Sequence, residues 1–197
     1  MDKYIYPTPS IIRETSQGYQ SINICDEMFA RREIECVGDI DETTTYSLCQ
    51  QIRQLAREDE CERITIFFNS PGGEVQSGLA IYDVMQAVSC PIRTVCLGMA
   101  ASMAALLFVS GDERLMLPHS RVMIHDPLIV GGVGGSALEL KTISDNLLRT
   151  RQVTAEVIAK HTGHGLDEVL EKTSRDSWFE ASAAVEWNLA DRIITSL

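Results

Sequence analysis

The chain reads IRTVCLGMAASMA from Ile92 to Ala104, and its character changes at the middle of this stretch. The part Ile92–Leu97 is apolar and β-branched, which predicts a buried strand. The part from Ser102 to Val109 is rich in alanine and large apolar residues, as expected for a fully buried helix. A lone serine, Ser102, stands where the strand gives way to the helix. The sequence therefore predicts a strand–turn–helix unit with a serine at its turn.

The same alternation recurs on both sides of this unit. Further strands are expected at Glu33–Val37, Arg63–Phe68, Arg114–Leu117 and Val122–Ile124, and helical stripes at Leu48, Ile52 and Leu55 and at Leu79, Tyr82 and Met85. Repeated strand–turn–helix order favours an α/β domain with parallel strand pairing and crossover helices.

A long helical pattern occupies the C-terminal third of the chain. It runs from about Ser136 to His161, directly after the glycine-rich stretch Gly131–Gly135. About 26 residues at a rise of 1.5 Å per residue span nearly 40 Å. A helix of this length outgrows a small domain, so we expect it to project outward and meet another subunit.

Composition narrows the function classes. The 197 residues are close to the length of a single domain, and 45% apolar with 23% charged residues are ordinary globular values. With 28 acidic against 17 basic residues the net charge is -11, which repels phosphate backbones. The uncharged run Thr94–Gly111 is too short and too rich in small residues for a comfortable membrane span. Neither nucleic acid nor a membrane is an expected partner.

The cysteines and the first residues indicate the compartment. Six cysteines are spread along the chain without a C-x-x-C pair, so neither a zinc knuckle nor a disulfide scaffold is expected. We expect reduced and mostly buried thiols. The segment Met1–Pro7 lacks the basic patch and apolar run of a signal peptide. A cytoplasmic location is therefore expected.

Three short motifs have chemical potential, and each also has an ordinary structural explanation. The hydroxyl of Ser102 could simply cap a helix, and no glycines of a G-x-S-x-G elbow surround it. The turn Asn69–Gly73 (NSPGG) presents backbone N–H groups that could form an oxyanion hole, or is a plain strand-to-helix turn. His125 closes a short apolar strand, where a histidine is more often structural. No single motif decides the function.

Together these motifs resemble the proteolytic-subunit family of the Clp (caseinolytic) proteases, from about Ile11 to Ile194. The segments that carry the resemblance are Asn69–Gly73, Gly98–Met103, Leu117–Pro127, His161–Gly163 and Thr173–Asp176. The resemblance implies an α/β, crotonase-like fold of repeated β-β-α units with a protruding strand–helix handle at about 128–161. It also implies an N-terminal axial-pore arm over residues 1–20 and a ClpP-like serine peptidase domain over residues 21–197.

The resemblance also implies the roles of five residues. It assigns the nucleophile to Ser102, the general base to His125 and the orienting carboxylate to Asp176, with oxyanion-hole N–H groups from Gly73 and Met103. A serine hydroxyl is a weak nucleophile and needs such a base, held in the right tautomer by a third group. The implied activity is that of a serine endopeptidase acting on unfolded proteins.

The same resemblance implies partners but no cofactor. Two heptameric rings would stack around a closed chamber, and an AAA+ unfoldase of the Clp type would feed polypeptides into it. ATP would be used only by that unfoldase, since Gly131–Gly135 matches no phosphate-binding motif. His161 and His164 lack an H-E-x-x-H pattern, so a helix cap and a surface residue are expected there rather than metal ligands.

Three positions depart from the family pattern. Asp126 and Ser136 stand where the family commonly has glutamine, and Ser174 replaces an acidic residue that often helps Arg175 bridge the rings. Because Ser174 lacks that charge and the glycine-rich stretch before Ser136 is costly to order as a strand, a labile double ring is expected. Two alternatives stay open: a structural or regulatory ClpP paralogue with low activity in a mixed ring, and an acyl-CoA hydratase or isomerase of the same superfold, which would need an acidic base.

Overall fold

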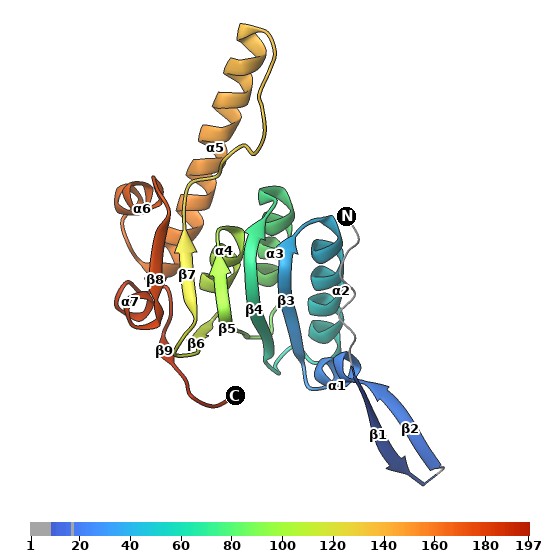
Figure 1. Cartoon of the computed structure of the whole chain (residues 1–197). Helices are drawn as coiled ribbons and strands as arrows, with labels where there is room; N and C mark the ends of the chain where they lie inside the picture. The colour runs from blue at the N-terminus through green and yellow to red at the C-terminus, as the bar shows by residue number, and fades with distance from the viewer. Residues whose placement is uncertain (1–8, 17) are drawn as a thin grey trace.

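The computed structural model describes residues 9–16 and 18–197, and its centre is a seven-stranded sheet (Figure 1). Its strands are β3 (Glu33–Ile40), β4 (Ile64–Gly73), β5 (Ile92–Ala101), β6 (Glu113–Met116), β7 (Arg121–Ile124), β8 (Ser177–Glu180) and β9 (Arg192–Ile193). The main path runs β3-β4-β5-β6-β9, with β7 paired to β5 and to β8. Only the pairing of β7 with β8 is antiparallel within this sheet. The expected α/β class with parallel pairing is confirmed.

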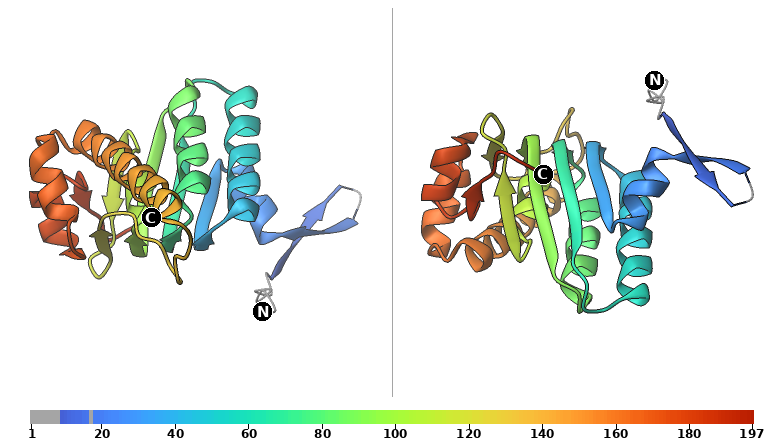
Figure 2. Two further views of the ribbon diagram at one scale, coloured as in Figure 1. Left: turned by 90° about the horizontal axis from the view of Figure 1, so that it is seen from above. Right: turned by 90° about the horizontal axis from the view of Figure 1, so that it is seen from below.

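Helices connect these strands and cover the sheet (Figure 2). They are α1 (Ile24–Ala30), α2 (Glu42–Glu58), α3 (Val75–Ala87), α4 (Met103–Val109), α5 (Ala137–Thr162), α6 (Leu166–Thr173) and α7 (Ala181–Glu186). The expected stripe Leu48, Ile52 and Leu55 is the buried face of α2, and every residue of α4 is buried. No described helix combines the length and apolarity needed to cross a membrane.

The long helix α5 projects from the body of the molecule (Figure 1). It spans 26 residues and begins with a capping box, in which Ser136 Oγ accepts from the Glu139 backbone N–H and Glu139 Oε2 accepts from the Ser136 backbone N–H. The departure at Ser136 thus starts the helix. Residues 128–135 before it pair with no strand of the described chain. The helix of the expected handle is therefore present, whereas its strand is not formed within a single chain.

The N-terminal arm contains a hairpin that the sequence pattern did not indicate. Strands β1 (Ser10–Thr15) and β2 (Gly18–Asn23) pair antiparallel and point away from the sheet, at the end opposite the tip of α5 (Figures 1 and 2). Nearly all their residues are exposed, so backbone pairing rather than core packing defines this element. Part of the expected arm, residues 1–8 and 17, lies outside the described residues.

All six cysteines are free thiols, and half of them are buried. Cys36, Cys90 and Cys96 lie in the core, whereas Cys25 and Cys61 are exposed. Burial raises the pKa of Cys36 to about 12 and that of Cys96 to about 11. The expectation of mostly buried thiols is thus correct for the core cysteines and wrong for the two exposed ones.

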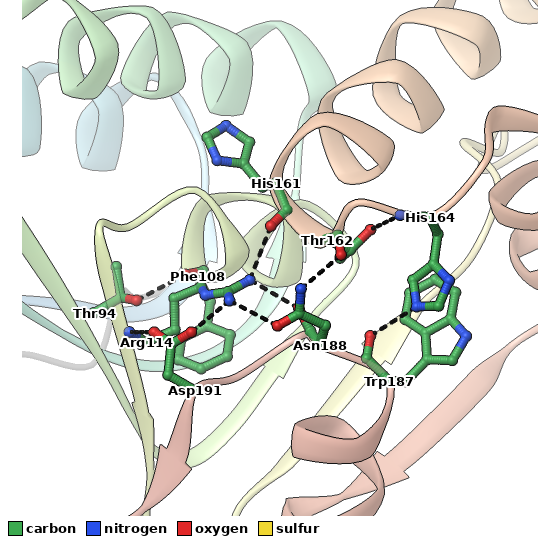
Figure 3. Close-up of polar contacts among 9 residues, drawn as sticks. All are labelled: Thr94, Phe108, Arg114, His161, Thr162, His164, Trp187, Asn188 and Asp191. Atoms are coloured by element: carbon green, nitrogen blue, oxygen red, sulfur yellow. Dashed lines mark hydrogen bonds and ion pairs between the residues drawn. The ribbon is translucent and has the colours of Figure 1, made fainter.

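A buried arginine secures the C-terminal end of α5 (Figure 3). Arg114 Nη1 donates to the backbone oxygens of His161 (3.1 Å) and Asn188 (2.8 Å), and its Nη2 donates to Asp191 Oδ1 (2.5 Å). Asn188 Nδ2 donates to the backbone oxygen of Thr162 (2.6 Å). Burial raises the pKa of Asp191, but the hydrogen bonds and charge of Arg114 outweigh it and lower the pKa below its usual value. The last carbonyls of α5 are therefore capped by side chains from distant parts of the chain.

The two histidines at this end of α5, His161 inside the helix and His164 just after it, pack against aromatic rings. The His161 ring meets Tyr82 edge-on at a centroid distance of 5.8 Å, and the His164 ring stacks on Trp187 at 4.1 Å. The stacked pair is visible in Figure 3. His164 is thus a packing residue rather than the simple surface residue that was expected.

Replacing Arg114 with methionine is expected to destabilise the protein by about 3 kcal/mol, because the carbonyls of His161 and Asn188 lose their donor and Asp191 loses its counter-charge. The partial exposure of Asp191 limits the loss. Thermal unfolding should occur about 6 to 12 °C lower for a chain of this size. Arg57→Met, on the exposed face of α2, is the matched control and should change the midpoint little. Equal midpoints for the two variants at one protein concentration would contradict the prediction.

Candidate active site

Ser102 occupies a strained turn between β5 and α4. Its backbone has φ 56° and ψ -123°, and its N–H donates to the Met123 backbone oxygen at 2.8 Å. A non-glycine residue at positive φ costs free energy, and backbone strain of this kind clusters at active sites, although Arg32 and Asn188 also have positive φ in this chain. Its side chain makes no capping hydrogen bond to α4. The alternative that the Ser102 hydroxyl caps the helix is therefore wrong.

His125 and Asp176 are brought together by the register of two strands. β7 and β8 pair antiparallel with Ile124 opposite Ser177, so the residues beyond this pair, His125 and Asp176, face each other at the strand ends. Ser102 lies at the end of β5, which pairs with β7 through Ala101 and Met123. Three segments far apart in the sequence thus meet at one edge of the sheet.

The three side chains form a continuous chain of polar contacts. His125 Nε2 lies 2.8 Å from Ser102 Oγ, and His125 Nδ1 lies 3.2 Å from Asp176 Oδ1. With a proton on Nδ1, the ring donates to Asp176 and leaves Nε2 free to accept from the serine hydroxyl. The His125 side chain is 15% exposed and that of Asp176 is 65% exposed. The arrangement can remove the proton of Ser102.

The turn Asn69–Gly73 lies against the turn that carries Ser102. A Cβ on Gly72 (φ 96°) would lie 2.7 Å from Ser102 Cβ and 2.9 Å from Met103 N. A Cβ on Gly73 (φ 159°) would instead lie 2.2 Å from the Ile40 backbone oxygen. Both positions therefore require glycine, Gly72 for the approach to Ser102 and Gly73 for the pairing of β4 with β3. A substitution at Gly73 would distort the pairing of β4 with β3, so its effect on activity would not isolate a role of the Gly73 N–H in an oxyanion hole.

A small pocket opens beside Ser102 and His125. Its other lining residues are mostly apolar and include Val75, Leu106, Ile124 and Ile158. Ile158 comes from the base of α5, a contribution that the sequence did not reveal because helical periodicity does not tell which site a buried face adjoins. Within the described ranges, no group of three His, Cys, Asp or Glu side chains is placed to hold a metal ion.

Thr173 and Arg151 both bind Asp126, the residue after His125, and sequence reasoning predicted neither contact. Thr173 Oγ1 donates to Asp126 Oδ1 at 2.6 Å, and Arg151 Nε donates to Asp126 Oδ2 at 2.5 Å. An arginine in a helix of mixed charge is usually expected to lie in solvent, so nothing in the sequence indicated that Arg151 binds Asp126.

The geometry agrees with a comparison of the chain with known protein families. The family model for Clp protease matches residues 16–197. The match covers both turns, the long helix and the segment that carries Asp176. The chain therefore belongs to the Clp protease family, whose members are serine peptidases.

Proposed function

We propose that this protein is a serine endopeptidase in which Ser102 is the nucleophile, His125 the general base and Asp176 the orienting carboxylate. The observation that carries the proposal is the contact of His125 with Ser102 on one ring nitrogen and with Asp176 on the other. The position of Ser102 at a strained turn supports the same assignment.

In the acylation step, His125 Nε2 takes the hydroxyl proton while Ser102 Oγ attacks the peptide carbonyl carbon. The carbonyl oxygen becomes an oxyanion, which the backbone N–H groups of Met103 and Gly73 would stabilise. Met103 is the first residue of α4, where an N–H group has no partner within the helix. His125 then gives its proton to the leaving amine, and the acyl-enzyme forms. Water, activated by the same histidine, releases the second product.

The pocket beside Ser102 is mostly apolar and has a free volume of about 20 Å³ in the single chain, so an apolar substrate side chain next to the scissile bond would have to widen it. We expect unfolded polypeptides as substrates, since an extended segment presents side chains and backbone to this pocket together. This chain would need no cofactor of its own.

The assembly belongs to the same proposal. Members of this family generally form oligomers and work with unfoldases. We expect two stacked heptameric rings in the cytoplasm, with the projecting α5 between rings, the hairpin β1–β2 at the axial pore, and an AAA+ unfoldase of the Clp type supplying substrate. The exposed apolar residues Leu138, Leu140 and Leu148 of α5 support burial of this helix in a larger assembly.

Labelling with a fluorophosphonate tests the proposed function. The probe phosphonylates an activated serine, so we expect one adduct per chain, which peptide mass spectrometry places on Ser102. Hydrolysis of a fluorogenic peptide should stop as labelling proceeds. Absence of labelling in the assembled protein would reject the proposal in favour of a subunit with little activity of its own.

Ser174→Asp is expected to strengthen the association of the rings. Ser174 ends α6, where its Oγ donates to the Glu171 backbone oxygen at 2.6 Å, and Arg175 has no hydrogen bond or ion pair within the described part of the chain. An acid at position 174 could pair with an arginine across the ring contact for about 0.2 to 1 kcal/mol per pair, repeated around the ring.

Sedimentation velocity and peptide turnover, measured together at several protein concentrations, check this prediction. Ser174→Asp should shift single rings to double rings and raise peptidase activity in parallel, whereas the uncharged control Ser174→Asn should do neither. If the unsubstituted protein is already fully double-ringed at submicromolar concentration and the acid changes nothing, the explanation of a labile ring fails.

A further inference from the structure

The contact of Asp176 with His125 needs support from outside the pair. The Asp176 carboxylate is 65% exposed, and its contact with His125 is its only hydrogen bond or ion pair in the described part of the chain. An exposed carboxylate with one partner loses side-chain entropy when it is held in place. The position of the backbone that carries Asp176 therefore decides how often the contact forms.

That backbone is attached to the residue that follows His125. The Asp126 N–H donates to the Thr173 backbone oxygen at 2.7 Å, and Thr173 Oγ1 donates to Asp126 Oδ1 at 2.6 Å. Thr173 is 3% exposed. Thr173 thus binds Asp126 through both its main chain and its side chain. It lies three residues before Asp176, so Asp126 is attached to the segment that carries this carboxylate.

The second oxygen of Asp126 binds an arginine that also holds α6. Arg151 Nε donates to Asp126 Oδ2 at 2.5 Å, and Arg151 Nη2 donates to the Leu170 backbone oxygen at 2.7 Å. The side chains of Asp126 and Arg151 are less than one third exposed. Because a carboxylate accepts on both oxygens, Asp126 binds a hydroxyl and a guanidinium at once, and its charge strengthens the hydrogen bond from Arg151.

We propose that Asp126 is a positioning residue for the peptidase reaction, which acts through Thr173 and Arg151 to hold the segment bearing Asp176 against His125. This inference rests on the proposed function, since it assumes that the contact between His125 and Asp176 serves catalysis. The carboxylate at position 126 touches neither the nucleophile nor the substrate pocket. Its charge is balanced by Arg151, so it adds little free negative charge beside the substrate.

The test compares two pairs of variants in the assembled protein. Asp126→Ala removes both acceptors, whereas in Asp126→Asn the amide oxygen can accept from Arg151 and the NH₂ can donate to Thr173 Oγ1. Thr173→Val removes the hydroxyl that Thr173→Ser retains. We expect kcat for a fluorogenic peptide to fall about 10- to 100-fold in Asp126→Ala and Thr173→Val, with KM within about twofold of the unsubstituted value, and to fall much less in Asp126→Asn. Thr173→Ser should recover most of the loss. Asp167→Asn, at the exposed start of α6, is the control and should leave kcat unchanged.

Three measurements separate the possible failures. Fluorophosphonate labelling of the unsubstituted protein at Ser102 first establishes the proposed function, and without it that function fails rather than the positioning role. With labelling present, unchanged kcat in Asp126→Ala and Thr173→Val overturns the inference, as does a loss of activity in Thr173→Ser equal to that in Thr173→Val. A fall in kcat that accompanies dissociation of the oligomer, seen by sedimentation velocity, also overturns it.

Discussion

Ser102→Ala is expected to lower peptide hydrolysis by about 10⁶-fold, to the background of the assay, while the fold and the assembly survive. The hydroxyl is the only group that the substitution removes, and its Oγ contacts His125 at 2.8 Å without capping α4. Because no structural hydrogen bond is lost, the thermal midpoint should stay within about 2 °C. Labelling by a fluorophosphonate should disappear together with turnover.

Ser110→Ala is the matched control at the other end of α4. Ser110 Oγ is buried and donates to the Leu106 backbone oxygen at 2.6 Å, so this variant loses a structural hydrogen bond without touching the proposed nucleophile. It should lose about 1 kcal/mol of stability and retain its activity within about twofold. Turnover above a few per cent of the unsubstituted rate in Ser102→Ala would mean that another group attacks the peptide.

The secondary structure from β3 to α5 could largely be predicted because local pattern and tertiary environment agree, whereas α1 before it and α6, β8, α7 and β9 after it were not predicted. The stripe Leu48, Ile52 and Leu55 is buried as the helical period requires, and the expected limits of α5 differ from the observed ones by one residue at each end. The hairpin β1–β2 was missed because its pairing is stabilised by backbone hydrogen bonds rather than by an apolar face. The handle strand was expected from resemblance, and a single chain offers it no partner.

The site shows where sequence reasoning ends. The sequence placed Ser102 at a turn but left its side chain free to cap α4 or to face a base, and the backbone angles with the contact to His125 decide between these two. The approach of Asp176 depends on the register of β7 with β8, which joins residues more than fifty positions apart. Without the family resemblance no local signal marks Asp176, because most acidic residues in such a segment are solvated. Nonlocal register is the information that the sequence pattern lacked.

Asp176→Asn is expected to lower kcat by between about 10² and 10⁴, with little change in KM. The amide can present its NH₂ to His125 Nδ1, which favours the tautomer with the proton on Nε2, and that nitrogen then cannot accept the proton of Ser102. A buried orienting carboxylate gives the upper figure. The 65% exposure of Asp176 lets water replace part of the contact, so a smaller loss within this range is the physical expectation for a single chain.

Steady-state rates with a fluorogenic peptide between about pH 6 and 9 check this prediction, and Glu168→Gln supplies its control. Glu168 makes the same kind of contact, 2.9 Å from His164 Nδ1, on a carboxylate that is 54% exposed. His164 lies stacked on Trp187 and away from Ser102, so loss of its carboxylate should leave kcat unchanged. If Asp176→Asn keeps more than a third of the unsubstituted kcat, the carboxylate does not set the tautomer of His125. The size of the loss of kcat also indicates how far Asp176 is buried in the assembled protein. A loss near 10⁴-fold requires that neighbouring subunits shield Asp176 from water.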